Sequence, residues 1–198
     1  MKVDTSTECM AEVLRRVPAG SSAIDIGCGT GSHSAAMVAH GLDVTAVDIS
    51  PKPDGLACAF VRSDVFNLDL PDQFDLVWSS HVMEHVDCPL DFLVKLRSLC
   101  RPGGTIAVTV PPLKHTIVPG HLTLWNTGLL MVHMLRAGIT IKGGWYGQHG
   151  YNVSVIGKNT GMKPCKSWRE IVAGLPDGVC EQGAKHFNGQ INGGDSDD

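Results

Sequence analysis

Three closely spaced glycines lie near the amino terminus, in the run Asp25-Ile26-Gly27-Cys28-Gly29-Thr30-Gly31. The run follows a short apolar stretch and precedes residues that suit a helix, as in a strand–turn–helix unit. Glycine suits such a turn because a side chain would hold the backbone away from a ligand. Asp48 ends the next apolar stretch, 17 residues after Gly31. A carboxylate there can accept both hydroxyl groups of a ribose, so the pattern predicts a ligand that contains a nucleoside.

Two kinds of nucleoside ligand make different demands on this turn. The dinucleotide fingerprint has a third glycine or alanine three residues after its second glycine, where this chain has Ser32. A carboxylate just before the first glycine, as at Asp25, is unfavourable beside a pyrophosphate. The same carboxylate favours a cationic ligand with an amino-acid end. The residues therefore favour the cationic ligand.

A second group of reactive side chains is the run His81-Val82-Met83-Glu84-His85. Its H-x-x-E-H spacing occurs in one group of zinc proteases, and on one helical face these three side chains could converge on a divalent ion. The pattern directly follows a predicted strand, and no acidic ligand helix is evident downstream. We therefore predict no metal, and interpret Glu84 and His85 as capping and packing residues.

These motifs, in this order, resemble the class I S-adenosylmethionine (SAM)-dependent methyltransferases of small molecules. The resemblance covers about residues 20–158, most of the chain. It rests on the glycine-rich motif, the acid Asp48, and further blocks at residues 63–65, 74–78, 84–86 and 96–104.

The resemblance implies a three-layer α/β sandwich around a seven-stranded, mostly parallel sheet of order 3-2-1-4-5-7-6, with one antiparallel strand. It also implies SAM as the methyl donor and S-adenosylhomocysteine as the product. Asp48 would bind the ribose, and Asp64 would face the adenine amino group. The residues predicted to bind the cofactor are Asp25, Gly27, Cys28, Gly29, Gly31, Asp48, Ile49, Asp64, Val65 and Ser79.

Hydrophobic periodicity and turn residues predict the elements that must position these side chains. An amphipathic helix spans residues 5–17, with Thr5 and Glu8 spaced as a capping box. Two prolines, at 51 and 53, disfavour a helix between the second and third strands, so a loop is expected there. Predicted strands are 23–26, 42–48, 59–65, 74–79, 105–110, 139–147 and 151–158, and predicted helices are 32–40, 89–100 and 125–137.

The chain is long enough for one well-buried α/β domain. We predict a methyltransferase domain over residues 1–160 and a tail over 161–198, with a weak helix near 167–173 followed by disorder. A tight turn at 101–104 is expected to precede the fifth strand.

Composition limits the partners and the compartment. The net charge is −4 and no basic run exceeds two residues, so we predict no nucleic-acid partner. Apolar runs are shorter than a membrane span. Seven cysteines without a C-x-x-C pair indicate reduced thiols, hence a cytoplasmic location. The sequence leaves the oligomeric state open.

The segment after the fifth strand is where this family builds its acceptor pocket. Trp125 and His115 are predicted to line it, since an aromatic face and an imidazole suit a hydroxylated ring. His81 and His121 are the candidate catalytic bases. The alternative is that Trp125 belongs to the core and His121 caps a helix.

The predicted function is SAM-dependent methylation of a small-molecule acceptor, at a hydroxyl group of a sugar, phenol or similar metabolite. Methylation of nitrogen or carbon is the alternative within the same chemistry. An inactive SAM-binding module is the alternative from a different class.

Overall fold

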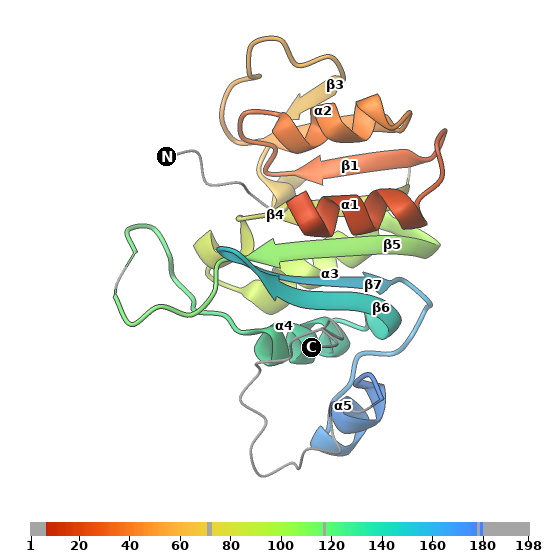
Figure 1. Cartoon of the computed structure of the whole chain (residues 1–198), viewed down its shortest axis with the longest axis vertical. Helices are drawn as coiled ribbons and strands as arrows, with labels where there is room; N and C mark the ends of the chain where they lie inside the picture. The colour runs from red at the N-terminus through yellow and green to blue at the C-terminus, as the bar shows by residue number, and fades with distance from the viewer. Residues whose placement is uncertain (1–6, 71–72, 117, 178, 180–198) are drawn as a thin grey trace, which may run out of the picture.

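A single seven-stranded sheet forms the centre of the computed structural model, which describes residues 7–70, 73–116, 118–177 and 179. The strand order is β3-β2-β1-β4-β5-β7-β6 (Figure 1). β7 is antiparallel to both of its neighbours, and the other neighbouring pairs are parallel. This confirms the predicted order and the single antiparallel strand. The strands are β1 (Ser22–Ile26), β2 (Asp43–Asp48), β3 (Ala59–Arg62), β4 (Phe74–Ser80), β5 (Cys100–Val110), β6 (Thr140–His149) and β7 (Asn152–Lys158).

Helices cover both faces of the sheet, which gives three layers (Figure 1). One face carries α1 (Thr7–Arg16) and α2 (Ser32–Ala39). The other carries α3 (Pro89–Leu99) and α4 (Thr127–Arg136). Two short 3₁₀ turns, η1 (Val65–Asn67) and η2 (Met83–His85), follow β3 and β4 at the carboxyl edge.

Side chains alternate between the two faces along each central strand, as the period of two requires. In β4, Leu76 and Trp78 join the core beneath α1 and α2, whereas Val77 joins the core beneath α3 and α4. All three are fully buried. Both faces of the sheet are therefore apolar, and polar groups that face a ligand are confined to its edges.

The amphipathic amino-terminal helix is α1, which buries Met10 and Val13 against β5 and β7. Its buried Glu12 forms ion pairs with Arg15 and Arg16. The predicted start at residue 5, with the Thr5 capping box, lies outside the described residues.

The predicted tight turn at 101–104 is wrong, because these residues belong to β5. They bulge between Cys100, which pairs with Phe74, and Thr105, which pairs with Leu76. Gly103 has φ 80°, and a Cβ at Gly104 would lie 2.6 Å from the Cys100 sulfur. The two glycines thus allow an irregularity inside the strand where the sequence indicates its start.

No helix separates β2 from β3 in the described chain, as the two prolines predict. After β7 the chain forms α5 (Trp168–Gly174), within one residue at each end of the predicted weak helix. Ser167 and Glu170 form a capping box there, and Ile171 and Leu175 are buried in the main core. Residues beyond 160 therefore pack on the domain, whereas the predicted disorder at 180–198 lies outside the described residues.

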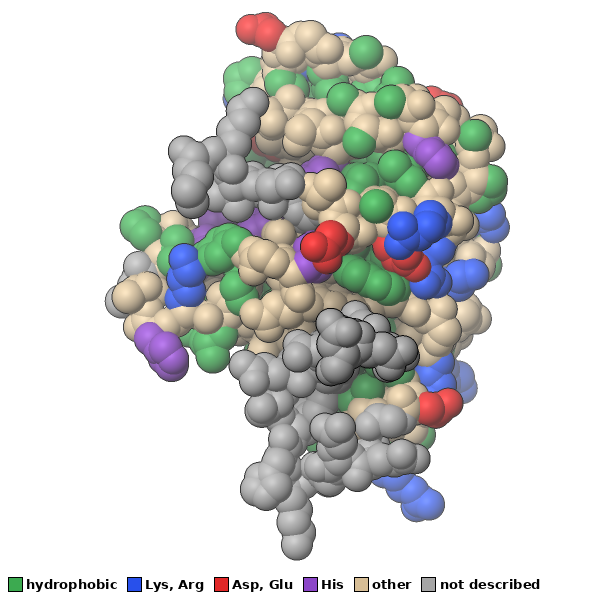
Figure 2. Space-filling model, in the orientation of Figure 1, with side chains coloured by type: hydrophobic (Ala, Val, Ile, Leu, Met, Phe, Trp, Pro, Cys, Tyr) green, Lys and Arg blue, Asp and Glu red, His purple; other side chains and the backbone are tan. Residues whose placement is uncertain are grey.

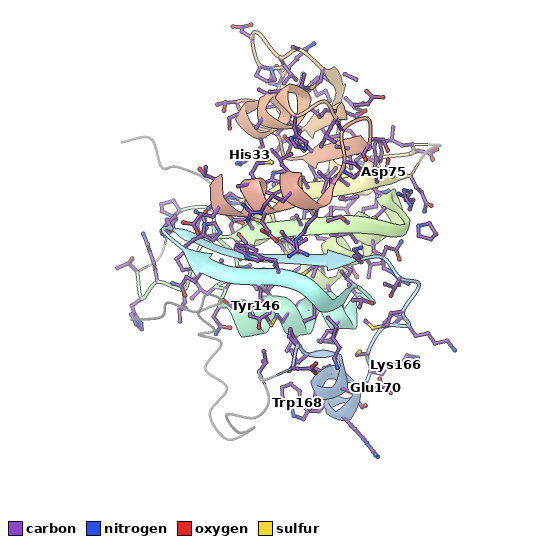
Figure 3. All side chains as sticks on the ribbon, turned by 45° about the vertical axis from the view of Figure 1, so that its right-hand side comes forward. His33, Asp75, Tyr146, Lys166, Trp168 and Glu170 are labelled. Atoms are coloured by element: carbon purple, nitrogen blue, oxygen red, sulfur yellow. The ribbon has the colours of Figure 1, made fainter. Side chains whose placement is uncertain are left out.

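The surface carries charges of both signs. Lys and Arg side chains lie beside Asp and Glu side chains on the face in Figure 2. Near α5, Figure 3 labels Lys166, Trp168 and Glu170, and Trp168 is 56% exposed. None of the described helices is both long and apolar enough to span a bilayer.

Candidate active site

The carboxyl ends of the parallel strands meet at one edge of the sheet, where open α/β sheets bind ligands. A cleft of about 420 Å³ lies there. Six of the residues predicted to bind the cofactor line it, together with His81: they are Gly27, Gly29, Asp48, Ile49, Asp64 and Val65. The cleft thus joins the turn after β1 to the ends of β2, β3 and β4.

The glycine turn opens one wall of this cleft. Gly29 has φ 53°, and a Cβ built on it would meet no atom within 4 Å. The position therefore faces open space that a ligand can fill. At Gly27, in contrast, a Cβ would lie 2.2 Å from a methyl group of Val82. Gly27 is needed for packing, and Gly29 keeps space for a ligand.

Asp48 stands at the end of β2 beside this turn. Its Oδ2 accepts a hydrogen bond from the Gly29 amide (2.8 Å), and its Oδ1 accepts one from the Ser50 amide (2.8 Å). A carboxylate has about four acceptor sites, so two remain for the hydroxyl groups of a ribose. Asp48 is therefore held in place by the backbone that surrounds the predicted ribose site.

Apolar side chains form the outer part of the cleft. Ile49 is 68% exposed and Phe66 is 46% exposed, and both line the cleft. Exposed apolar side chains that line a cleft suit contact with a flat ring. Asp64 uses Oδ1 to cap η1 through the Phe66 amide (2.9 Å), which leaves Oδ2 for an exocyclic amino group.

Four predicted cofactor residues do not line the cleft. Asp25, Cys28 and Ser79 are each at most 5% exposed, and Gly31 lines a separate cavity of about 300 Å³ beside α2. Asp25 accepts a hydrogen bond from Ser34 Oγ (2.6 Å). Burial raises the pKa of Asp25 to about 6, against the opposing effects of Ser34 and nearby His33. Its predicted contact with the ligand's amino-acid end remains a prediction.

The cleft fits SAM in three respects. The Gly29 position leaves space against the backbone, Asp48 retains acceptor sites, and Ile49 and Phe66 line the cleft with exposed apolar side chains. These are the features that a methionine portion, a ribose and an adenine need. The sequence-based interpretation missed Phe66 because it placed residues 59–65 in a strand. The strand ends at Arg62, and Asp64 caps a 3₁₀ turn that brings Phe66 to the cleft.

His81 borders the cleft in a constrained backbone conformation. It is the one described non-glycine residue with positive φ, at 57°. Its Nε2 donates to Asn152 Oδ1 (2.8 Å), and its Nδ1 lies 3.3 Å from Glu84 Oε1. Burial lowers the pKa of His81, but the Glu84 carboxylate and the Asn152 oxygen outweigh it, so the pKa is raised. With both nitrogens engaged, this imidazole is poorly placed to accept a proton.

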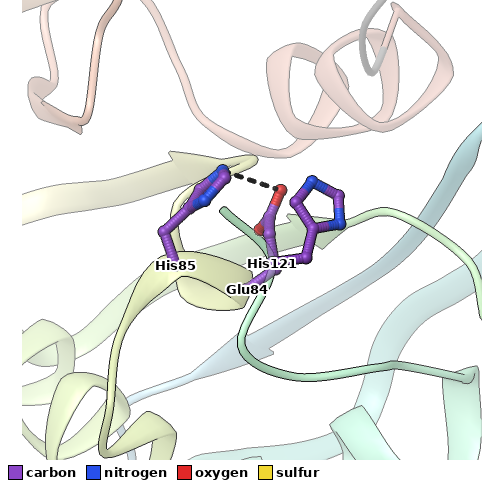
Figure 4. Close-up of side chains that lie close together, drawn as sticks. All are labelled: Glu84, His85 and His121. Carbon is purple, nitrogen blue, oxygen red and sulfur yellow. Dashed lines mark ion pairs between the residues drawn. The ribbon is translucent and has the colours of Figure 1, made fainter. Parts of the chain in front are cut away.

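Glu84 lies at the centre of a group of imidazoles (Figure 4). His85 Nε2 is 3.7 Å from Glu84 Oε1, and a ring nitrogen of His121 lies within 4.8 Å of both residues' polar atoms. His85 Nδ1 donates to the Gly120 carbonyl (2.7 Å). Ligands that meet at a tetrahedral zinc ion are about 3.4 Å apart, given bonds of about 2.1 Å. In the described group, Glu84 Oε1 and His85 Nε2 are 3.7 Å apart and all three ligand atoms lie within 4.8 Å of one another, so the absence of a metal there stays a prediction.

The segment after β5 contributes His121 but not Trp125 to this region. Trp125 is 2% exposed, and its indole nitrogen donates to Thr123 Oγ1 (2.8 Å). As placed, it has no ring face available for an acceptor, so it belongs to the core. His115 is exposed and is not part of the histidine group. The helix α4 is capped by Asn126, not by His121.

Comparison with known proteins places this site in a family. Residues 24–108 match the family described as "Methyltransferase domain". The ubiquinone biosynthesis O-methyltransferase of Schizosaccharomyces pombe is 32% identical over 148 residues, or 68% of this chain and 51% of that protein. The chain therefore spans about half the length of this relative.

Two solved structures show the same fold. The 1,6-didemethyltoxoflavin-N1-methyltransferase of Burkholderia thailandensis, with bound S-adenosylhomocysteine, superposes with a TM-score of 0.69 at 19% identity, covering 80% of each chain. The [4+2]-cyclase SpnF superposes with a TM-score of 0.58 at 20% identity, over 68% of this chain and 57% of that one. The strand order, the cleft and the matched domain agree: residues 24–108 are a methyltransferase domain, in a chain with the fold of the class I, SAM-dependent methyltransferases.

Proposed function

We propose that this chain transfers a methyl group from SAM to a hydroxyl group of a small molecule. The observation that carries the proposal is the histidine group beside the cofactor cleft. A neutral aromatic amine can attack the methyl group without losing a proton first, whereas most hydroxyl groups need a base. The name of the S. pombe relative, an O-methyltransferase, supports the same reaction.

SAM supplies a methyl group on a positively charged sulfur, so transfer is favourable once the acceptor is aligned. The residues of the chain hold the donor and position the acceptor oxygen in line with the methyl group. Asp48 and Gly29 hold the nucleoside part, and Ile49 and Phe66 enclose the ring. The chain then needs one group that accepts the acceptor's proton.

Of the two histidines predicted as that base, His121 is the better candidate. Both nitrogens of His81 are engaged by Asn152 and Glu84. The ring nitrogens of His121 have no hydrogen-bond partner within the described part of the chain. A base needs an available nitrogen within hydrogen-bond reach of the acceptor.

The test is turnover of SAM with a panel of acceptors that present matched hydroxyl, amine and carbon nucleophiles on one ring. Formation of S-adenosylhomocysteine with the hydroxylated member alone supports the proposal. Turnover only with the amine, or only at carbon, would replace it with N- or C-methylation. Binding of SAM without turnover on any acceptor would favour a binding module, and the SpnF comparison shows that this fold also occurs in a protein named as a cyclase.

We also propose that the acceptor is a small molecule and that the protein is located in the cytoplasm. The S. pombe relative is named as mitochondrial, so cell fractionation is the direct check of the compartment.

A further inference from the structure

Glu84 is an acidic side chain that is buried at the carboxyl edge of the sheet. It is 0% exposed, and the described groups that pair with it are imidazoles, not backbone amides or side chains of Lys and Arg. A buried carboxylate is unfavourable unless it is paired, because its charge loses the solvation of water. A role that depends on this charge would explain why the fold retains it.

Three imidazoles surround this carboxylate. His81 and His85 come from the segment after β4, and His121 comes from the segment after β5. His81 Nδ1 is 3.3 Å from Oε1 and His85 Nε2 is 3.7 Å from it. His121 presents a ring nitrogen within 4.8 Å of the polar atoms of Glu84 and His85. Figure 4 shows the carboxylate between the rings of His85 and His121.

The first two imidazoles are fixed by other groups. His81 donates to Asn152 Oδ1 (2.8 Å) and stacks on Tyr151, with 14° between the ring planes. His85 donates from Nδ1 to the Gly120 carbonyl. Both therefore have one nitrogen committed to a partner other than Glu84. No such hydrogen bond joins the His121 ring to another described residue, so this ring is the one left for Glu84 to orient.

The backbone brings His121 to this place. The Leu122 amide donates to the Glu84 carbonyl (2.7 Å), and this bond clamps the segment after β5 onto η2. Gly120 allows the close approach, because a Cβ there would lie 3.4 Å from His85 Nδ1. The same clamp sets the ring of His121 edge-on to that of His85, with centroids 5.0 Å apart.

We propose that Glu84 is a positioning residue: it orients His121 and stabilises the imidazolium that forms when His121 takes the proton of the acceptor. The inference rests on the proposed function, since it assigns a partner to the base of that reaction. A base oriented by a buried carboxylate is a recurrent arrangement in enzymes that activate a hydroxyl group. Glu84 itself does not touch the acceptor, because its side chain is fully buried.

The reaction balances with these groups alone. The bond between the acceptor oxygen and the methyl carbon forms as the carbon–sulfur bond breaks, and the electron pair of that bond stays on sulfur. The proton of the acceptor hydroxyl moves to His121. The positive charge thus passes from sulfur to the imidazole, where the Glu84 carboxylate stabilises it, and His121 later releases the proton to water.

The test is a double-mutant cycle with Glu84→Gln, His121→Ala and the double variant, measured as turnover at saturating SAM. Glu84→Gln keeps the size of the side chain and removes its charge. An opposite charge within about 4–6 Å stabilises a protonated imidazole by roughly 10-fold or more in its proton equilibrium, and a rate that depends on this proton changes by a similar factor. We expect a loss of that order in the wild-type background and no further loss once His121 is alanine. Equal losses in both backgrounds would overturn the proposal.

Three further measurements separate this mechanism from a structural effect. Glu84→Asp should restore part of the lost turnover because it restores the charge. Glu12→Gln, at another buried carboxylate that lies on α1, should leave turnover unchanged. Thermal melts should show that Glu84→Gln is at least as stable as the wild type, since a buried charge is removed. Failure of the aspartate variant to recover any turnover would contradict the charge-based role.

A readout without acceptor distinguishes failure of this inference from failure of the proposed function. Nitrogen-15 NMR of the imidazoles reports the protonation of His121 directly, with no turnover needed. Compared at one pH, its signals should differ between the wild type and Glu84→Gln, because the charge beside the ring is removed. Unchanged His121 signals would contradict the inference even if the protein methylates hydroxyl groups. A shift without any O-methylation would leave the coupling intact and reject the reaction.

Discussion

Substitution of Gly29 by valine tests the cofactor site most directly. Gly29 lines the cleft, its φ is 53°, and an added Cβ would meet no protein atom within 4 Å. The valine methyl groups would therefore occupy the space assigned to SAM without displacing any side chain of the fold. We expect the variant to fold and to lose the cofactor.

The magnitude has two parts. An L-residue at this backbone conformation costs about 1–2 kcal/mol, which a domain of ordinary stability of about 5–15 kcal/mol tolerates. For the ligand, the methyl groups exclude the bound position, and any shift of the turn also strains the bond from the Gly29 amide to Asp48 Oδ2 (2.8 Å). We expect the affinity for S-adenosylhomocysteine to fall at least about 100-fold, which corresponds to about 2.7 kcal/mol.

The assay is calorimetric titration with S-adenosylhomocysteine, with circular dichroism to establish folding. Gly20→Val is the matched control, because Gly20 also has a positive φ (84°) with no atom within 4 Å of an added Cβ, yet it lies before β1, away from the cleft. It should bear the same backbone strain and retain binding. A folded Gly29→Val variant that binds within threefold of the wild type would refute the placement of the cofactor.

Three other predictions follow from the same edge of the sheet. Asp48→Ala should cost about 1–3 kcal/mol of cofactor affinity by calorimetry, while Asp43→Ala, at the other end of β2, should cost none. The pKa of buried Asp25 is raised to about 6 from 3.8, so its carboxyl favours folding fully below about pH 4 and loses that contribution as pH rises through 6. Asp25→Asn should therefore gain stability relative to the wild type between pH 4 and 7.5, by about 3 kcal/mol in denaturant titrations, and equal stability differences at both pH values would contradict this. Turnover should persist in EDTA because imidazoles, not a metal ion, are the predicted neighbours of the Glu84 carboxylate, and activity restored only by added magnesium or zinc would reverse that conclusion.

The features that sequence predicted well are those set by local backbone demands. Gly29 and Asp48 lie together in one cleft because a turn with positive φ needs glycine and because strand ends meet at one edge of a parallel sheet, and their contact with the cofactor stays a prediction. The strand order was implied by the resemblance to the class I methyltransferases, and the structure confirms it. The break between β2 and β3 followed from prolines that cannot continue a helix.

The sequence does not predict features that depend on which other side chains a residue contacts in the fold. Trp125 was a candidate pocket residue because an aromatic after β5 suits an acceptor ring. Its indole hydrogen is instead satisfied by Thr123, two residues earlier, and its ring is buried in the core. Periodicity does not reveal that local bond, and Phe66 was missed for a similar reason, since a 3₁₀ turn replaces the end of the predicted strand.

The histidine pattern after β4 shows how backbone conformation changes the meaning of a motif. The H-x-x-E-H spacing indicates a metal site only if the three side chains share one face of a helix. In the structure His81 precedes the turn with φ 57°, and only Met83–His85 forms a single 3₁₀ turn. His81 is thereby directed toward Asn152 on β7. The third side chain of the group with Glu84 and His85 is His121, from the segment after β5. The chemistry of Glu84 therefore depends on a residue 37 positions away, which the clamp between Leu122 and Glu84 holds within reach.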